Sequence, residues 1–207
     1  RLYNISYTDI LSNTDDIETS IASIEYQGNL GFDPADLKMS QKMNSQKNNP
    51  MSKDHIKGPN IPIDTESELD VQMVSQTAPY PVEYWFWDTP AWLYIFSVDF
   101  FNNQTVPDVI SMSWGWSESD QCEIITCDPS ITSEQYVKRV NAEYVKIGLR
   151  GVTILSSSGD AGAPGRTNEM CLDITPISPI FPSSSPWVLS VGATFLVDDS
   201  NSNNGLC

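Results

Sequence analysis

Apolar and polar positions follow their most regular pattern in the second half of the chain, where they predict a strand, a helix and another strand. Residues Thr132–Leu149 carry apolar side chains at helical spacing, and Thr132 followed by Gln135 is a capping-box pattern at their start. The apolar runs Val109–Ser113 and 152–155 on either side predict two short buried strands. Such a βαβ unit is right-handed and places both strand ends at one edge of a parallel sheet.

The first half of the chain is less regular. The polar stretch Tyr7–Glu25 predicts a loop followed by a short helix, and the lysine-rich stretch Lys38–Asn60 predicts an exposed polar connection. Asp88–Pro90 predicts the start of a helix whose aromatic residues pack in the core. The apolar stretch 84–101 is interrupted by charged residues and a proline, so it is too broken to span a bilayer. The polar end 198–207 is expected to be flexible.

Length and charge narrow the class of protein. A chain of 207 residues is long enough for one domain, over 1–207, with a sizeable core. The formal net charge of −16 argues against nucleic acid and anionic membranes as partners. In an acidic compartment the carboxylates would become neutral and stop repelling one another. The start at Arg1 without a signal peptide is typical of a processed chain.

Cysteines and glycosylation sequons point to a secretory route. The sequons begin at Asn4 and Asn103, and an oxidising route makes disulfides expected. The first two cysteines enclose a short loop and could pair with each other, whereas the last two could pair with each other or reach a second chain. No spacing typical of a zinc site is present, and no metal site is expected in this chain. The four cysteines are Cys122, Cys127, Cys171 and Cys207.

A strand that ends in a glycine-rich turn makes Asp160 a candidate for chemistry. The segment 151–165, GVTILSSSGDAGAPG, passes from an apolar run into this turn. Open α/β folds carry functional groups in turns at the carboxyl ends of their strands. A protonated carboxyl group there can donate a hydrogen bond to a developing oxyanion. The alternative interpretation is that Asp160 caps the turn.

An acidic pair lies in the segment 65–72, TESELDVQ. Thr65 and Glu68 form a capping-box pattern that predicts the start of a helix. Glu66 and Asp70 are then one turn apart on the same face. If the pair is buried, the two carboxyl groups share a proton and suit acid–base chemistry in acid. The alternative is a solvated acidic first turn that complements the helix dipole.

Together these motifs resemble the sedolisins, or serine-carboxyl peptidases. The resemblance implies a subtilisin-like α/β fold, with helices on both faces of a parallel sheet, of which this chain is the N-terminal part. RLYNI resembles the start of a mature domain after its propeptide. The matching segments, in family order, are RLYNI (1–5), ESELDVQ (66–72), PDVISMSWG (107–115), SSGDAG (157–162) and FPSSSPWVLSVGAT (181–194).

The resemblance implies a role for each acidic residue. Glu66 would be the general base for a nucleophilic serine, Asp70 its proton-sharing partner, and Asp160 the oxyanion donor. Subtilisin-like folds use histidine and asparagine for the first and last roles, but the only histidine here, His55, lies in a polar stretch without a predicted partner. A peptide would pair with the strand ends as an added strand. The residues expected to bind it are Ser113, Trp114, Gly115, Ser158 and Gly159.

Two features of the family lie beyond this chain. Its nucleophile belongs to a downstream Gly-Thr-Ser segment, and its calcium site is also C-terminal. The chain alone is therefore expected to be inactive, with the serine and Ca²⁺ held by a second polypeptide, disulfide-linked or not, or by a missing part of the sequence.

The expected function is that of an acid-acting serine peptidase that releases tripeptides from free N-termini. The expected location is a lysosome, another acidic vacuole or the outside of the cell. One alternative is an acid endopeptidase of the same family. Another is a peptide-binding relative without catalysis, which would not need Glu66, Asp70 and Asp160 together.

Overall fold

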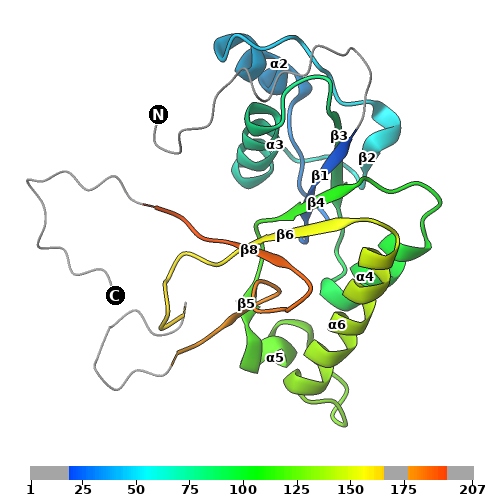
Figure 1. Ribbon diagram of the computed structural model, residues 1–207, viewed down its shortest axis with the longest axis vertical. Helices are drawn as coiled ribbons and strands as arrows, with labels where there is room; N and C mark the ends of the chain where they lie inside the picture. The colour runs from blue at the N-terminus through cyan, green and yellow to red at the C-terminus, as the bar shows by residue number, and fades with distance from the viewer. Residues whose placement is uncertain (1–18, 166–176, 195–207) are drawn as a thin grey trace, which may run out of the picture. The chain divides into compact units, whose positions relative to one another are not determined.

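The computed structural model describes residues 19–165 and 177–194, which group into two compact units (Figure 1). The first unit contains the chain up to Trp92 together with Asn102–Ser111. The second contains Leu93–Phe101 and the chain from Met112 onward. That the whole chain forms one domain stays a prediction.

The first unit is built on parallel strands in the order β2-β3-β1-β4. Strand β3 pairs with β1 from Ser20↔Glu83 to Glu25↔Asp88, and with β2 on its other side. Both β1 and β3 are buried at five of their six positions, as expected for strands covered on both faces. The strands are β1 (Ser20–Glu25), β2 (Ile56–Lys57), β3 (Glu83–Asp88) and β4 (Val109–Met112).

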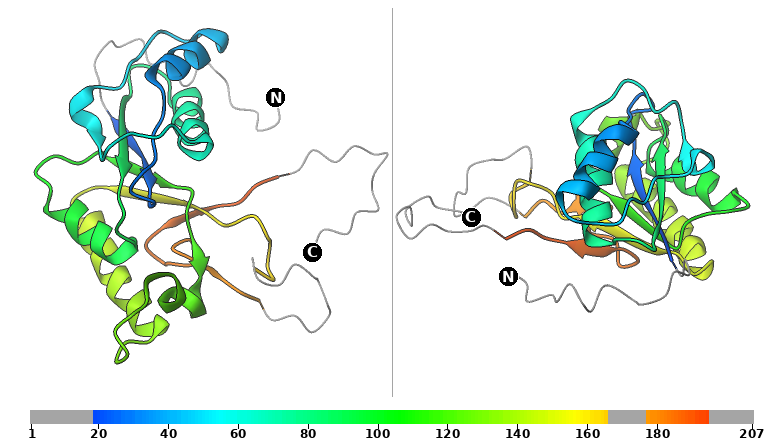
Figure 2. Two further views of the ribbon diagram at one scale, coloured as in Figure 1. Left: turned by 180° about the vertical axis from the view of Figure 1, so that it is seen from behind. Right: turned by 90° about the horizontal axis from the view of Figure 1, so that it is seen from above.

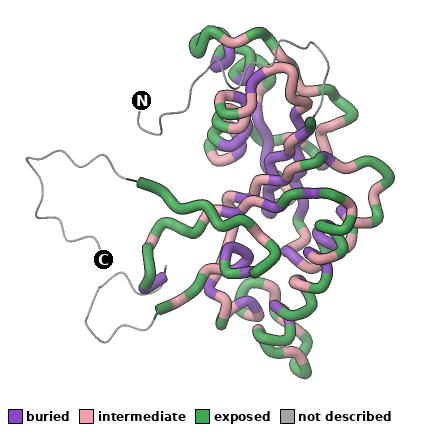
Figure 3. Tube along the Cα trace, in the orientation of Figure 1, coloured by how far each residue is buried: buried purple, intermediate pink, exposed green. Residues whose placement is uncertain are grey.

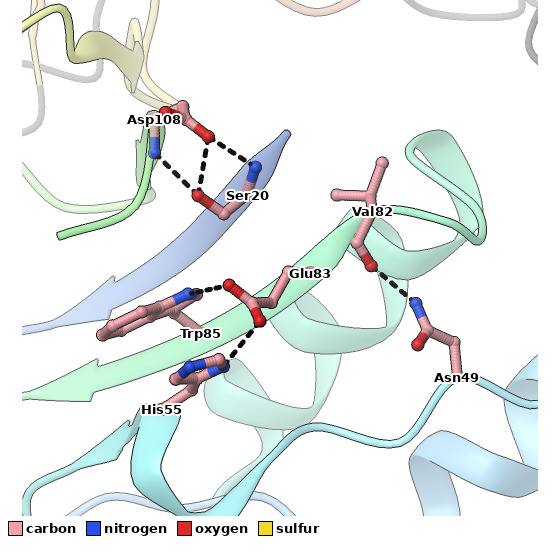
Figure 4. A network of polar contacts seen from close by, with 7 residues as sticks. All are labelled: Ser20, Asn49, His55, Val82, Glu83, Trp85 and Asp108. Atoms are coloured by element: carbon pink, nitrogen blue, oxygen red, sulfur yellow. Dashed lines mark hydrogen bonds and ion pairs between the residues drawn. The ribbon is translucent and has the colours of Figure 1, made fainter. Parts of the chain in front are cut away.

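Strand β1 corrects the last part, 20–25, of the loop and short helix predicted for Tyr7–Glu25, whose first part lies outside the described residues. The two serines of the strand made the segment look polar, but the structure buries both, and Ser20 has hydrogen-bond partners. The backbone N–H and the hydroxyl of Ser20 both donate to Asp108 Oδ2 at 2.8 Å, and the Asp108 N–H donates back to the Ser20 hydroxyl at 3.0 Å (Figure 4). These bonds tie the start of β1 to the start of β4.

Two helices, α2 (Pro34–Met43) and α3 (Thr65–Thr77), lie side by side next to β1 and β3 (Figures 1 and 2). The polar connection predicted for Lys38–Asn60 is therefore wrong in its first part, because 38–43 belong to α2. Gln41 of this helix is buried and exchanges hydrogen bonds with the backbone of Asn49, both at 2.9 Å. The core between the helices and the sheet includes Phe32, Leu37, Val71 and Phe86.

His55 also has partners that the sequence did not predict. It ends the short 3₁₀ helix η1 (Lys53–His55) and stacks on Trp85 of β3, with ring centroids 4.0 Å apart. Its Nδ1 lies 3.7 Å from Glu83 Oε1, and the Trp85 indole N–H donates to Glu83 Oε2 at 3.3 Å (Figure 4). The His55 side chain is only 17% exposed. The polar stretch is thus attached to β3.

The second unit contains the predicted βαβ helix. Strand β6 (Thr153–Ser157) pairs in parallel with β8 (Leu189–Val191), whereas β5 (Trp116–Ser117) and β7 (Ile180–Phe181) form a separate antiparallel pair. The helices are α4 (Leu93–Asn102), α5 (Gln121–Ile125), preceded by the 3₁₀ turn η2 (Glu118–Asp120), and α6 (Ser133–Leu149). The parallel strand pairs of each unit, together with the helices, confirm the predicted α/β class.

Helices α4 and α6 are joined through a buried tyrosine. The backbone N–H of Tyr94 donates to the Tyr136 hydroxyl at 3.0 Å, and burial raises the pKa of Tyr136 to about 12. Helix α4 begins at Leu93, later than predicted, because Asp88 ends β3 instead of starting a helix. The Asp88 carboxylate accepts hydrogen bonds from the backbone of Gly28 and Leu30.

The capping box of α6 is present, with Thr132 as N-cap. The Gln135 N–H donates to Thr132 Oγ1 at 3.3 Å, and the Thr132 N–H donates to Gln135 Oε1 at 3.0 Å. We expect Thr132→Ala to lower the free energy of unfolding by about 1 kcal/mol, measured by urea denaturation, because an N–H at the helix start loses its partner. Thr132→Ser keeps the hydroxyl and is the control. An equal loss in both variants would contradict the assignment.

Candidate active site

The predicted acidic pair lies in the first turns of α3, in the first unit. Helix α3 begins at Thr65, and the carboxylate of Asp64 caps it by accepting from the Glu66 N–H at 2.8 Å. Glu66 is half-buried and Asp70, one turn later, is 9% exposed. The structure therefore places both carboxyl groups on the same helix face, as predicted, and buries the second of them.

The predicted capping box of α3 is wrong, because Thr65 lies inside the helix. Glu68 instead joins two helices, since its carboxylate accepts from the Asp33 N–H at 2.5 Å and from the Gln72 side chain at 2.8 Å. Asp33 in turn caps α2 by accepting from the Ala35 N–H. The start of α3 is thus fixed to the start of α2, which orients the face that carries the acidic pair.

Two further carboxyl groups, which sequence reasoning missed, lie at the carboxyl ends of β1 and β3. Glu25 is fully buried and Asp88 is 4% exposed, and the two residues are paired in the sheet register. Helix α3 packs against β1, so these groups belong to the same unit as the acidic pair. In the sequence, each of these two carboxyl groups belongs to an acidic residue at the end of an apolar run, IASIE or YWFWD. The pattern was missed because neither run was predicted to be a strand.

Asp160 lies in the second unit, in the turn that follows β6. Ser158 continues the strand direction, and its N–H donates to the Val191 carbonyl at 2.9 Å. Gly159 has a φ of +90°, a backbone conformation that residues with a side chain rarely adopt and that turns the chain sharply. Asp160 is exposed directly after this glycine. The carboxyl end of β6 therefore presents Asp160 to solvent, and its role as an oxyanion donor stays a prediction.

The two predicted substrate-binding segments meet at one side chain of β7. Ser113–Gly115 directly follow β4, and a Cβ atom placed on Gly115 would lie 2.6 Å from Ile180 Cγ2. A Cβ atom placed on Gly159 would lie 3.2 Å from Ile180 Cγ1. The predicted convergence of these strand ends is therefore present within the second unit. Trp114 and Trp116 are both half-buried, and Trp116 pairs with Phe181 in the β5–β7 ladder.

The structure describes some of the predicted disulfide and glycosylation sites, and others lie outside the described residues. Cys122 and Cys127 form a disulfide, the first of the pairings left open by the sequence. Asn103 is half-buried just after α4.

Between 19 and 194, apart from 166–176, no group of three acidic, histidine or cysteine side chains could hold a metal ion. Over the same residues, no helix is long and apolar enough to cross a membrane. Outside the described residues lie Asn4, Cys171, Cys207, and the segments 1–5 and 198–207.

Comparison with curated proteins gives clear relatives, although no family model matches the chain. Physarolisin of Physarum polycephalum is 44% identical over 181 residues, which cover 86% of this chain and 31% of physarolisin. Human tripeptidyl-peptidase 1 is 31% identical over 142 residues, or 62% of this chain and 21% of that protein. The chain therefore spans less than a third of the length of these relatives.

Comparison with solved structures gives the same architecture. The structure of "Pseudomonas sedolisin (serine-carboxyl proteinase) complexed with two molecules of pseudo-iodotyrostatin" matches with a TM-score of 0.59 and 20% sequence identity. The match covers 84% of this chain and 47% of that chain. At this identity the match shows the fold, and the likeness to the curated relatives is the separate evidence for the family.

The close approach at Gly115 can be tested directly. A Cβ atom there would also lie 3.0 Å from the Phe181 carbonyl oxygen, a backbone atom that cannot swing away. We expect Gly115→Ala to lower the free energy of unfolding by about 1–3 kcal/mol, measured by urea denaturation. Gly148→Ala is the matched control, because nothing lies within 4 Å of its Cβ position. In helix α6 that alanine should be neutral or stabilising by up to about 1 kcal/mol. Equal stability of the two variants would contradict the packing described.

Proposed function

The chain belongs to the sedolisin family of serine-carboxyl peptidases, and from this premise we propose that it supplies the acid–base pair and the oxyanion donor of an acid-acting peptidase. The observation that carries the proposal is the burial of Asp70 one helical turn from half-buried Glu66. A solvated helix start would leave both carboxylates in water. Partial burial instead favours a proton shared between them.

The proposed chemistry assigns one proton transfer to each group. Glu66 accepts the proton of a serine hydroxyl as its oxygen bonds to the carbonyl carbon of the peptide. Asp70 holds Glu66 in place and shares its proton. Protonated Asp160 donates a hydrogen bond to the oxyanion that forms on the carbonyl oxygen. The proton on Glu66 then passes to the leaving amine, and water releases the acyl group from the serine by the same steps.

The proposal requires a part of the enzyme that this chain does not span. The nucleophilic serine is assigned to the C-terminal portion of the peptidase domain, whether on the same or a second polypeptide. Calcium, which structures that portion in the family resemblance, is assigned there too, since the described residues provide no group of three suitable side chains. A peptide is the proposed substrate, and it lies against the segments that follow β4 and β6.

The three carboxyl groups proposed for the chemistry require acidic conditions. Two carboxyl groups can share a proton, and a third can donate one, only where carboxyl groups are partly protonated. The formal net charge of −16 also becomes smaller in acid, which reduces repulsion within the chain. We therefore assign the protein to a lysosome, to another acidic vacuole or to an acidic extracellular space.

The general-base role of Glu66 predicts a large kinetic effect. In the peptidase assembled with its serine-bearing portion, Glu66→Gln should lower turnover by about 10²–10⁴-fold, because the amide cannot accept the serine proton. Peptide hydrolysis and circular dichroism would be measured together, and the fold should be unchanged. The control is Glu134→Gln, at an exposed position on α6. Turnover close to wild type in Glu66→Gln, or a pH optimum at or above neutrality, would rule out the assignment.

The mode of cleavage is a separate question. Tripeptide release is the activity in the name of tripeptidyl-peptidase 1, to which this chain is 31% identical, against 44% to physarolisin, and we therefore propose the acid endopeptidase alternative. We expect the assembled enzyme to cleave an N-acetylated peptide about as fast as the same peptide with a free amino group. A tripeptide-releasing enzyme would need the free terminus. Loss of cleavage on acetylation would therefore show the exopeptidase.

A further inference from the structure

Strand β5 directly follows the predicted peptide-binding segment Ser113–Gly115. It pairs with β7 in the register Trp116↔Phe181 and Ser117↔Ile180, and β7 is its one strand partner among the described residues. A strand of two residues with a single partner strand needs further hydrogen-bond partners for its backbone, because a buried carbonyl group without a partner destabilises a fold. The position of β5 therefore depends on what else its carbonyl groups contact.

One buried side chain provides those contacts. Gln121, the first residue of α5, is 0% exposed, and its Nε2 donates to the carbonyl oxygens of Trp116 and Ser117, both at 3.1 Å. A glutamine amide carries two N–H donors, so this group can hold both carbonyls of β5 at once. Helix α5 and strand β5 lie next to each other (Figure 1). Gln121 thus gives β5 hydrogen bonds of the kind that a second neighbouring strand would give.

The helix that carries Gln121 is itself fixed in place. A helix of five residues has little stability of its own. In α5 the disulfide between Cys122 and Cys127 closes the chain around the helix, and the Cys122 N–H donates to the Ser133 hydroxyl at 3.1 Å. Ser133 is the first residue of the 17-residue helix α6. The backbone that carries the Gln121 amide is therefore anchored to a long helix.

The β5–β7 pair also determines how far apart the two predicted peptide-binding segments lie. Ile180 of β7 lies against both segments, since Cβ atoms placed on Gly115 and Gly159 would lie 2.6 Å and 3.2 Å from its side chain. Residues 113–117 are half-buried or buried, whereas 158–160 are exposed (Figure 3). A shift of β5 along β7 would therefore move the packed segment relative to the open turn.

We propose that Gln121 is a positioning residue for the substrate. By holding β5 against β7, it keeps the backbone of Ser113–Gly115 at the spacing from the turn 158–160 that an extended peptide requires. A peptide that adds as a strand binds through backbone hydrogen bonds, which form only if the receiving strand lies at strand spacing. A receiving strand that is already ordered also reduces the entropy lost on binding. The inference rests on the proposed function for the identity of the ligand as a peptide.

Removal of the two donors tests this role. Gln121→Met keeps nearly the same length but cannot donate to the carbonyls of β5. The matched control is Ser133→Ala, which removes the hydrogen bond between α5 and α6 and leaves the Gln121 amide in place. Both variants should lower the unfolding midpoint, because each loses a hydrogen bond of α5. Gln121→Asn, with its amide on a shorter side chain, is the second variant should Gln121→Met fail to fold.

Peptide binding would be measured without catalysis. Each variant would be made in the Glu66→Gln background, assembled with the serine-bearing portion, and mixed in acid with fluorescein-labelled peptides from a casein digest. Fluorescence anisotropy gives the dissociation constant, which we expect Gln121→Met to raise about tenfold or more and Ser133→Ala to leave unchanged. With Glu66 intact, Gln121→Met should raise KM by about the same factor and lower kcat much less, because it removes an interaction made before the reaction.

A lower unfolding midpoint of Gln121→Met with an unchanged dissociation constant and KM would show a purely structural glutamine and overturn the inference. An equal rise of the dissociation constant in both variants would also overturn it, because the effect would then come from a loosened α5. So would the absence of peptide binding in the assembled Glu66→Gln protein.

Two further results separate this inference from the proposed function. Peptide binding that depends on Gln121, without hydrolysis by the enzyme with Glu66 intact at any pH, would refute the function and leave the positioning role in place. Hydrolysis with a dissociation constant and a KM that do not depend on Gln121 would do the reverse.

Discussion

The parallel pairing of β1 with β3 is the constraint on which the first unit depends. Both strands are buried along nearly their whole length, so helices and loops must cover them on each side. Because parallel strands end at the same edge, Glu25 and Asp88 arrive there together. Asp88 then holds the loop after β1 through the backbone of Gly28 and Leu30. The sheet thereby fixes the surface against which α3 packs.

Helix α3 is positioned by polar contacts more than by apolar packing. Val71 is the one large apolar residue among its buried positions, and the others are serines and Asp70. The helix start is instead fixed by the cap from Asp64 and by the contact of Glu68 with the α2 cap residue. The acidic residues of the helix thus have separate roles. Glu68 anchors the helix, which leaves Glu66 and Asp70 for the chemistry proposed.

The parts of the fold that could be predicted from the sequence are those in which the side chains of one kind lie on one face of an element. Helix α6 was predicted because one face is apolar and its capping box is explicit. The acidic pair followed from helical spacing in a helix that was correctly expected there, although its predicted cap was wrong. Strands β1 and β3 were missed because burial on both faces leaves no alternation to detect. In β1 the buried serines also look polar, and the contact of Ser20 with Asp108 explains the first of them. The stacking of His55 on Trp85 likewise depends on tertiary contacts that no local pattern encodes.

The exposed turn of Asp160 bears on one step of the proposed mechanism. Asp160 follows β6 directly, and the N–H of Ser158, between them, is bonded to Val191 of β8. A carboxyl group donates a hydrogen bond only while it is protonated, and burial disfavours its charged form. In this chain the turn is open to water. A peptide bound over this turn would withdraw water from it, which is the setting in which a hydrogen bond to a developing oxyanion is strongest.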